Sequence, residues 1–164
     1  MGEPWLVIEP FENTRLDGVV ELALRAWAPV FESLRDAMGP AVYRAFYRDD
    51  WRAAQRRAVE SVCSDPGLHV WVATEQSRSA GFVALKLHPE DQMGEIYMIA
   101  VDPDFQRRGI ATRLTSHAVD WFRKAGMSIV MVETGGDPGH APARRTYEAS
   151  GFRLLPVARY FKGL

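Results

Sequence analysis

Helical periodicity dominates the first part of the chain, whereas short apolar runs separated by turns dominate the second. A first apolar run predicts a strand over residues 5–8. Apolar positions near helical spacing then predict three helices, over residues 14–27, 30–38 and 41–63. Pro29 is expected to interrupt the helical pattern, and Gly39 with Pro40 to end its second part. A further break near Asp49 and Asp50 is left open by the pattern.

A turn at residues 64–67 separates this helical part from a series of strands. Strands are expected over residues 68–74, 80–87, 94–101, 128–132 and 152–161, and helices over residues 108–125 and 141–150. The run at 128–132 is continuously apolar, which is typical of a buried parallel strand. This order predicts an α/β or α+β domain, residues 1–164, with a mixed sheet and helices on both faces.

Composition narrows the classes of function that are compatible with the chain. The chain has 164 residues, of which 47% are hydrophobic and 25% charged, as is usual for a globular domain with its own core. The net charge of −1 disfavours a general attraction to nucleic acid or to a membrane surface. Any anion-binding site must therefore be local, built from a loop and a few arginines.

Several other classes are disfavoured by features that the sequence lacks. Cys63 is the only cysteine, so we expect no disulfide within the chain, and the histidines show no metal-ligand spacing, so we expect no metal. No apolar run approaches the roughly 20 residues of a membrane helix. The first residues do not resemble a secretory signal. We therefore expect a cytoplasmic protein.

A short glycine-containing turn, Gln-Arg-Arg-Gly-Ile-Ala at residues 106–111, joins an expected strand to an expected helix. The first N–H groups of a helix have no partner, and the helix dipole adds partial positive charge there. Gly109 lets the backbone approach an anion, and Arg107 and Arg108 add cationic donors. The turn predicts a phosphate site made of Gln106, Arg107, Arg108, Gly109, Ile110, Ala111 and Thr112.

The turn resembles the acyl-CoA pyrophosphate loop of the GNAT superfamily of N-acyltransferases, whose pattern is Gln/Arg-x-x-Gly-x-Gly/Ala. A second block, residues 140–152, resembles the segment Asn-x-x-Ala-x-x-x-Tyr-x-x-x-Gly-Phe of the same family. Its matching positions are Ala143, Tyr147, Gly151 and Phe152, and His140 stands where the family usually has asparagine. Because both blocks occur in the right order, the chain is identified as a member of this family.

The resemblance implies a GNAT-like fold, with a mixed, mostly antiparallel central sheet and one splayed strand pair. Residues 1–64 would then contain the first strand and the variable acceptor-side helices. Residues 68–164 would form a strand meander and the acyl-CoA-binding core. A homodimer is also compatible with the resemblance.

The resemblance further implies direct acetyl transfer from acetyl-CoA to an amine, with Tyr147 as general acid. Glu95 is the candidate base, acting through water, and Glu133 is its rival. Strict alternation along the strand would point Glu95 and Tyr97 to one side, and Met98 and Ala100 to the other.

The co-substrate residues implied by the resemblance come from three segments. The strand backbone at Met98, Ile99, Ala100 and Val101 would pair with the pantetheine amides, in the manner of an added strand. The backbone of residues 108–112 would hold the pyrophosphate, with Gln106 and Arg107 beside it. The remaining candidates lie around the second block, at His140, Ala143 and Arg144. For His140, a hydrogen bond to pantetheine, a role in starting the helix and a second acid or base role all stay open.

The acceptor side is carried by fewer signals. In this family the N-terminal helices wall the acceptor site, and this chain places aromatic residues there that either line a pocket or belong to the core. The candidates are Trp27, Phe31, Tyr97 and Glu133. Acidic residues in the same helices (Glu32, Asp49 and Asp50) would attract a cation, unless they are simply solvated.

We expect an acetyl-CoA-dependent N-acetyltransferase acting on a primary amine of a small molecule. A peptide or protein acetyltransferase, acting on an N-terminus or a lysine, is the alternative enzyme. A non-catalytic acyl-CoA sensor is the alternative of another class, and the presence of both Tyr147 and Glu95 disfavours it.

Overall fold

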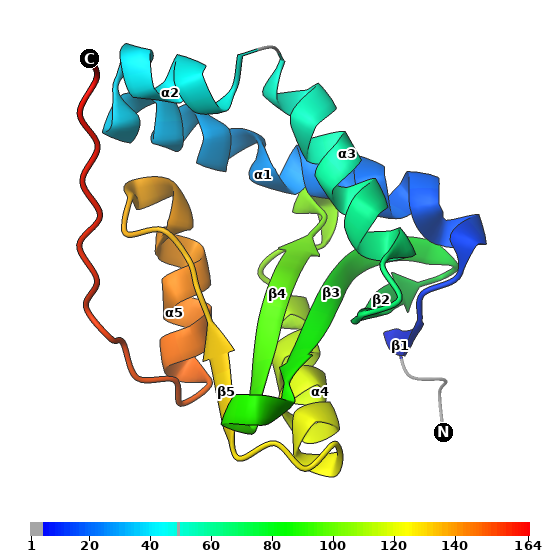
Figure 1. Ribbon diagram of the computed structural model, residues 1–164. Helices are drawn as coiled ribbons and strands as arrows, with labels where there is room; N and C mark the ends of the chain where they lie inside the picture. The colour runs from blue at the N-terminus through cyan, green and yellow to red at the C-terminus, as the bar shows by residue number, and fades with distance from the viewer. Residues whose placement is uncertain (1–4, 49) are drawn as a thin grey trace.

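The computed structural model describes residues 5–48 and 50–164, and its centre is a five-stranded sheet (Figure 1). The strands lie in the order β1-β2-β3-β4-β5, and neighbours are antiparallel except for the parallel pair β4 and β5. This confirms the expected mixed, mostly antiparallel sheet. The strands are β1 (Val7–Pro10), β2 (Leu68–Glu75), β3 (Arg78–His88), β4 (Met93–Val101) and β5 (Ile129–Val132).

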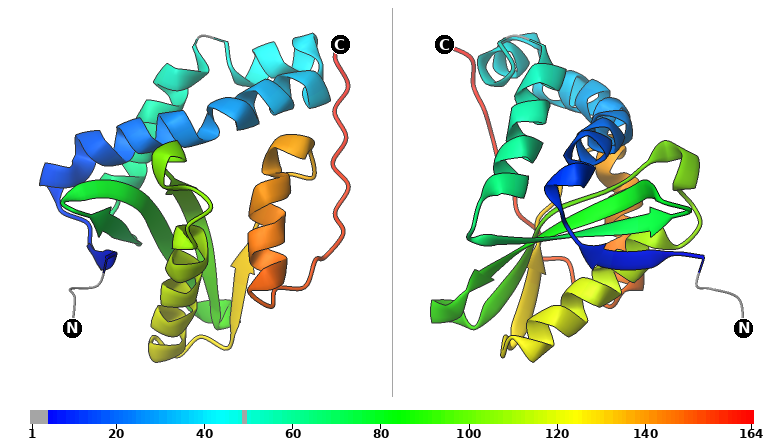
Figure 2. Two further views of the ribbon diagram at one scale, coloured as in Figure 1. Left: turned by 180° about the vertical axis from the view of Figure 1, so that it is seen from behind. Right: turned by 90° about the vertical axis from the view of Figure 1, so that its right-hand side faces the viewer.

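Helices cover both faces of the sheet, as Figure 2 shows from two sides. α1 and α3 lie on one face, α4 lies on the other, and α5 follows β5 at the edge of the sheet. The helices are α1 (Leu16–Met38), α2 (Pro40–Phe46), α3 (Trp51–Ser64), α4 (Ile110–Lys124) and α5 (Ala141–Ala149). Short 3-10 turns precede α1, β4, α4 and α5.

The core consists of two layers of buried side chains, one on each side of the sheet. Alternating side chains of the strands point to opposite faces, so each layer takes every second strand residue. The layer towards α4 includes Val83, Leu85 and Phe122, and the layer towards α1 and α3 includes Val20 and Phe82. The middle of the sheet is therefore buried on both faces, whereas the edge strands β1 and β5 are partly exposed.

Gly94 makes the close packing of α4 on β4 possible. A Cβ atom at this position would lie far inside contact distance of the buried Phe122 ring. We expect Gly94→Ala to lower the free energy of unfolding by about 1–3 kcal/mol, because a filled core relaxes poorly. Thermal unfolding measures this effect, and Gly136→Ala is the matched control, since a Cβ there meets nothing within 4 Å. Equal melting temperatures for the two variants would contradict the packing argument.

Pro29 does not interrupt the first helix, contrary to the sequence-based expectation. α1 runs without a break from Leu16 to Met38, with Pro29 inside it. Proline in a helix interior costs about 3 kcal/mol, since it removes one hydrogen bond and crowds the preceding turn. Buried side chains lie on both sides of it, with Val20 and Ala23 before and Phe31 after, and their burial outweighs this cost.

The helical pattern is interrupted close to Asp50, where the sequence left a break open. α2 ends at Phe46, and α3 begins at Trp51. The side chain of Asp50 caps α3 by accepting a hydrogen bond of 3.1 Å from the N–H of Arg52. Asp49 itself lies outside the described residues.

The strand expected over residues 152–161 is wrong. This segment has no regular secondary structure and runs beside α5 towards α2, where Phe161 meets Phe46 with ring centroids 5.4 Å apart (Figure 1). Its apolar side chains, Leu155 and Val157 among them, are largely exposed. An apolar run becomes a strand only where a neighbouring edge pairs with it, and Pro156 cannot donate to such a ladder.

Two further features bear on the expected classes. None of the helices within residues 5–48 and 50–164 combines the length and the apolar character that crossing a membrane requires. In the same part of the chain, no three His, Cys, Asp or Glu side chains are grouped as a metal would require.

Candidate functional site

β4 and β5 pair only at one end and then diverge, which creates the splay that the family resemblance implied (Figure 1). The paired residues run from Met93 with Ile129 to Ile96 with Val132. Beyond Ile96, no described strand pairs with this edge of β4. The backbone groups from residue 97 to 101 on that edge are therefore available to an extended ligand that takes the place of a strand.

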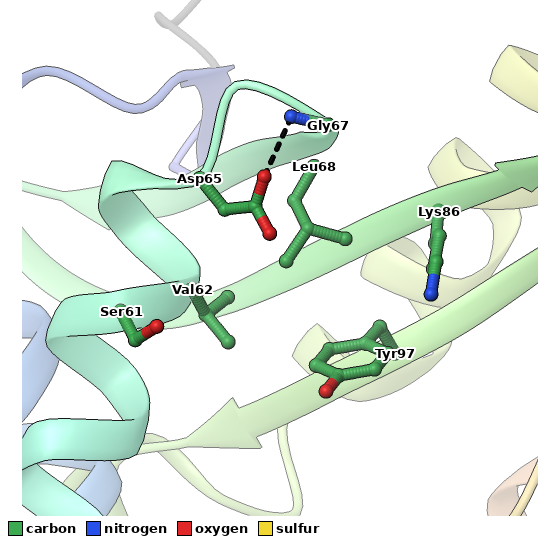
Figure 3. A pocket seen from close by; sticks show the side chains of 7 residues that line it. All are labelled: Ser61, Val62, Asp65, Gly67, Leu68, Lys86 and Tyr97. Carbon is green, nitrogen blue, oxygen red and sulfur yellow. Dashed lines mark hydrogen bonds between the residues drawn. The ribbon is translucent and has the colours of Figure 1, made fainter.

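A β-bulge at Tyr97 changes which side chains of β4 share a face. The pairing with β3 skips Tyr97, so that Ile96 lies opposite Leu85 and Met98 opposite Ala84. Met98 and Ala100 consequently pack towards α1 and α3, the same side towards which Tyr97 points (Figure 3). The expectation that Met98 and Ala100 point away from Tyr97 is wrong, because strict alternation holds only without a bulge.

The turn after β4 has the geometry of an anion cradle. Arg107 and Gly109 adopt left-handed backbone conformations, with φ of 59° and 78°. The regular helix α4 therefore begins only after Gly109, at Ile110. The first backbone bond into α4 is donated by Arg113 to the Gly109 carbonyl, at 3.0 Å. The N–H groups of residues 107–112 find no acceptor in the described part of the chain, and they meet where the dipole of α4 is positive.

Side-chain contacts hold this turn in place. The amide of Gln106 donates to the Val101 carbonyl at 3.0 Å, which ties the turn back to the end of β4. The guanidinium of Arg108 lies 2.7 Å from a Glu75 carboxylate oxygen and 5.3 Å from the Trp5 ring centroid. Arg108 thus braces the turn against β2, while Arg107 is exposed and makes no ion pair with any described residue.

A second brace, which the sequence reasoning missed, connects α1 to the start of the turn. Asp102 is buried, accepts from Arg25 at 2.9 Å and caps the 3-10 turn at the N–H of Asp104, also at 2.9 Å. Arg25 also binds Asp104 and holds the pKa of that carboxyl below its usual range. The sequence signal was the Asp-Pro pair directly after a strand, which is typical of a capped turn.

Tyr147 lies on α5 and is almost completely buried, with 8% of its surface exposed. Its ring packs beside Phe152, the last residue of the second sequence block, with ring centroids 5.9 Å apart. Burial raises the pKa of the Tyr147 phenol to about 12. The phenol therefore keeps its proton throughout the neutral range, as a proton donor must.

The two carboxylates considered as bases have different surroundings. Glu95 lies in the paired part of β4, and one of its oxygens is 2.7 Å from Nε2 of His88. Glu133 follows β5, is largely exposed and lies 3.5 Å from the guanidinium of Arg159. Each carboxylate therefore already has a polar partner, and the role of Glu95 as base stays a prediction.

The loop between β5 and α5 is tied together by polar contacts. The carboxylate of Asp137 accepts from Ser33 of α1 at 2.6 Å, and its other oxygen is bonded to Nδ1 of His140. Arg144 donates to the carbonyls of Asp137, at 2.9 Å, and Gly135. Arg144 thus supports the loop, and Ala143 lies beside it on the first turn of α5. Sequence reasoning missed Ser33, because nothing local marks a serine in the middle of a helix.

The predicted acceptor residues are distributed over three places. Trp27 and Phe31 pack into the helical layer, where Trp27 meets Phe82 and Phe31 stacks on Trp51 at 4.3 Å. Tyr97 lines a small hollow of about 130 Å³ between α3 and the sheet (Figure 3). Glu133 lies at the end of β5. The structure therefore does not bring these four side chains together.

A larger hollow of about 630 Å³ lies between α1 and the 3-10 turn before α5. On the α1 side the lining includes two acidic residues, Glu32 and Asp36, and on the turn side it consists of Pro138 and Gly139. The remaining lining residues are Pro29, Ser33 and Ala37. Sequence reasoning pointed to Glu32 but not to Asp36. One helical turn separates these two carboxylates, which therefore lie on the same face of α1.

The fold and the turn together define an α+β domain whose sheet splays beside an anion cradle. The model of the acetyltransferase (GNAT) family matches residues 27–152. The chain therefore belongs to the GNAT acetyltransferase family, as the two sequence blocks indicated.

Relatives in sequence include a mycothiol acetyltransferase of Rhodococcus opacus (strain B4), 36% identical over 104 residues, which is 60% of this chain and 33% of that protein. An uncharacterized N-acetyltransferase of Bacillus subtilis (strain 168) is 32% identical over 96 residues, 58% of this chain and 63% of that protein. The alignment thus spans about a third of the mycothiol acetyltransferase.

Solved structures share the fold at low sequence identity. The aminoglycoside acetyltransferase AAC(6′)-Iy, in complex with a bisubstrate analogue of CoA, superposes with a TM-score of 0.66 at 16% identity, over 96% of this chain and 97% of that one. The ribosomal-protein-S18-alanine N-acetyltransferase of Escherichia coli gives 0.63 at 22% identity, over 92% and 79%. These similarities show the architecture and leave the acceptor open.

Proposed function

We propose that the protein transfers an acetyl group from acetyl-CoA to the primary amine of a small molecule. The observation that carries the proposal is the row of N–H groups at residues 107–112, which have no acceptor among the described residues and lie at the end of the splayed strand pair. This row fits a pyrophosphate, and the open edge of β4 fits the amides of an extended pantetheine arm. When bound, the thioester supplies an activated acyl carbon.

Tyr147 is the proposed general acid, and its phenol gives a proton to the departing sulfur. Glu95 is the proposed base, acting through water on the acceptor nitrogen. Gln106 and Arg107 flank the pyrophosphate, and the backbone at Met98, Ile99, Ala100 and Val101 binds pantetheine. The cytoplasmic location expected from the sequence belongs to the same proposal.

A small, cationic acceptor is supported by the acidic hollow that Glu32 and Asp36 line beside the loop before α5. Carboxylates favour a protonated amine over a neutral or anionic compound. The similar proteins with named activities include acetyltransferases of mycothiol and of aminoglycosides, which are small molecules by name. Acetylation of a peptide N-terminus is the alternative that the experiment must separate.

The first test is thermal unfolding with and without acetyl-CoA. At a concentration about 100 times the dissociation constant, binding to the native state alone adds about 2.7 kcal/mol, which raises the melting temperature by roughly 5–10 °C. Release of the CoA thiol is then followed with ethanolamine, glucosamine, spermidine, aniline and a peptide that begins with alanine. We expect turnover with a small amine to exceed turnover with the peptide.

The outcomes separate the three classes of function. A thermal shift without thiol release from any amine would indicate an acyl-CoA sensor. Preference for the peptide would indicate a protein acetyltransferase. No thermal shift would overturn the binding of acetyl-CoA and with it the whole proposal.

A further inference from the structure

Three polar side chains from two distant parts of the chain form one hydrogen-bonded series. The Oγ of Ser33 in α1 donates to one oxygen of Asp137 at 2.6 Å, and Nδ1 of His140 is bonded to the other. The N–H of Gly139 also donates to Ser33 and Asp137, at 2.9 and 3.1 Å. The carboxylate is therefore held from three sides, and it orients the imidazole.

The series determines which ring nitrogen of His140 carries the proton. Only 6% of the Asp137 side chain is exposed, and burial alone would raise its pKa. The bonds from Ser33 and His140 nevertheless hold the pKa of Asp137 below its usual range, so it is ionised near neutral pH. An ionised carboxylate only accepts, which makes Nδ1 of His140 the donor and leaves the lone pair on Nε2.

The unprotonated nitrogen of His140 is accessible. Nε2 makes no hydrogen bond with any described residue, and 21% of the side chain is exposed. An imidazole whose Nδ1 is held by a carboxylate and whose Nε2 is open is arranged to accept a proton. A role in starting α5 does not explain the contact between His140 and Asp137, because the His140 side chain caps no backbone group of α5.

His140 lies in the chain next to two parts of the proposed site, the helix that carries Tyr147 and the acidic hollow. His140 directly precedes α5, and Tyr147 lies about two helical turns further along the same helix. Pro138 and Gly139, immediately before His140, form one wall of the acidic hollow. His140 thus directly follows the segment that lines the hollow proposed for the amine and directly precedes the helix that carries the proposed acid.

We infer that His140 is a catalytic base that takes the proton from the ammonium form of the acceptor, with Asp137 and Ser33 as positioning residues. The inference rests on the proposed function and extends it, since an ammonium nitrogen loses two protons, of which Glu95 takes only one and Tyr147, as the acid, takes none. The charged groups around this segment are Asp137, which is bonded to His140, and Arg144, which donates to the Asp137 carbonyl; Glu32 and Asp36 of α1 line the hollow beside Pro138 and Gly139.

A protonated amine loses two protons when it becomes an amide, one before attack and one after the C–N bond has formed. His140 accepts the first at Nε2 and releases it to solvent, and Glu95 accepts the second through water. The C–S bond breaks as Tyr147 donates its proton to sulfur, and Tyr147 regains a proton from Glu95 through water. One proton in total reaches the solvent.

The test compares two classes of amine, because an amine that is already neutral does not need the first step. Ethanolamine and glucosamine are protonated at pH 7, whereas aniline is neutral. We expect His140→Asn to lower kcat/KM about 100-fold with the more active protonated amine and less than about threefold with aniline. Asparagine is the residue that the family usually has at this position, and His69→Asn, at an exposed position of β2, is the matched control.

Further readouts separate catalysis from folding. The acid limb of the wild-type pH profile for the protonated amine should be absent in His140→Asn. Asp137→Asn should lower the same rate by about tenfold, and the melting shift caused by acetyl-CoA should be unchanged in both variants. A loss that is equal for both amines, or no loss in an otherwise active enzyme, would overturn the role of His140 and leave the proposed function standing.

A measurement without turnover tests the geometry itself. The ¹⁵N spectrum of the imidazole side chains of the wild-type protein at pH 8 should show the His140 proton on Nδ1. A proton on Nε2 would overturn the inference, whatever the kinetics. Failure of every amine to react in the presence of bound acetyl-CoA would overturn the proposed function and the role of His140 together.

Discussion

Replacing Tyr147 by phenylalanine is expected to lower kcat by about 10²- to 10⁴-fold and to leave the affinity for CoA nearly unchanged. The phenylalanine ring keeps the contact with Phe152 and removes only the hydroxyl, so the fold should be retained. A steady-state assay of thiol release measures kcat, and calorimetric titration measures the dissociation constant of CoA. Unchanged turnover would remove Tyr147 as the acid.

The pH dependence provides a second check on Tyr147. Burial raises the pKa of its phenol to about 12, so the proton is present at all pH values below that. Activity should therefore show no alkaline decrease attributable to Tyr147 between about pH 7 and pH 10. Tyr160→Phe, at a residue that is 90% exposed, is the control for the loss of a phenol as such.

Replacing Gly109 by aspartate is expected to weaken CoA binding by about 100- to 1,000-fold. A carboxylate in the cradle would face the pyrophosphate, and two like charges about 4 Å apart repel by about 4 kcal/mol at an effective dielectric constant of 20. An energy of that size corresponds to nearly a thousandfold in affinity. Calorimetric titration with CoA measures it, and an unchanged dissociation constant would disprove the cradle.

Gly109→Asn is the matched control for the charge. Asparagine and aspartate both tolerate the left-handed conformation better than other residues with a side chain, and a Cβ at this position meets nothing within 4 Å. Both variants should therefore fold. If the charge is responsible, Gly109→Asn will bind CoA much more tightly than Gly109→Asp, whereas equal losses would assign the effect to the backbone.

Periodicity and turn residues predicted those parts of the site that lie within one short segment of the chain. The strand, turn and helix from Met93 to Lys124 appear where the periodicity placed them, because a strand, a glycine turn and a helix start depend on nearby residues. The placement of Tyr147 on a helix that ends before Gly151 followed from the same kind of signal. The family model over residues 27–152 agrees with the two motifs.

Other expectations failed where distant contacts decide the outcome. Pro29 was expected to interrupt a helix, but buried neighbours on both sides keep α1 continuous. The bulge at Tyr97 places Met98 on the face of its neighbour, and no residue pattern marked it. Residues 152–161 have strand-like composition, yet no described edge pairs with them.

By itself the sequence determined the order of most elements, the family and the two motifs of the proposed site, because periodicity, turns and motifs are properties of neighbouring residues. Only the tertiary structure decided which side chains act together. Ser33 reaches Asp137 across 104 residues, Arg25 reaches Asp102 across 77, and Arg108 reaches Glu75 across 33. Such pairs leave no local pattern, since the packing of helices on the sheet is what brings them within hydrogen-bonding distance.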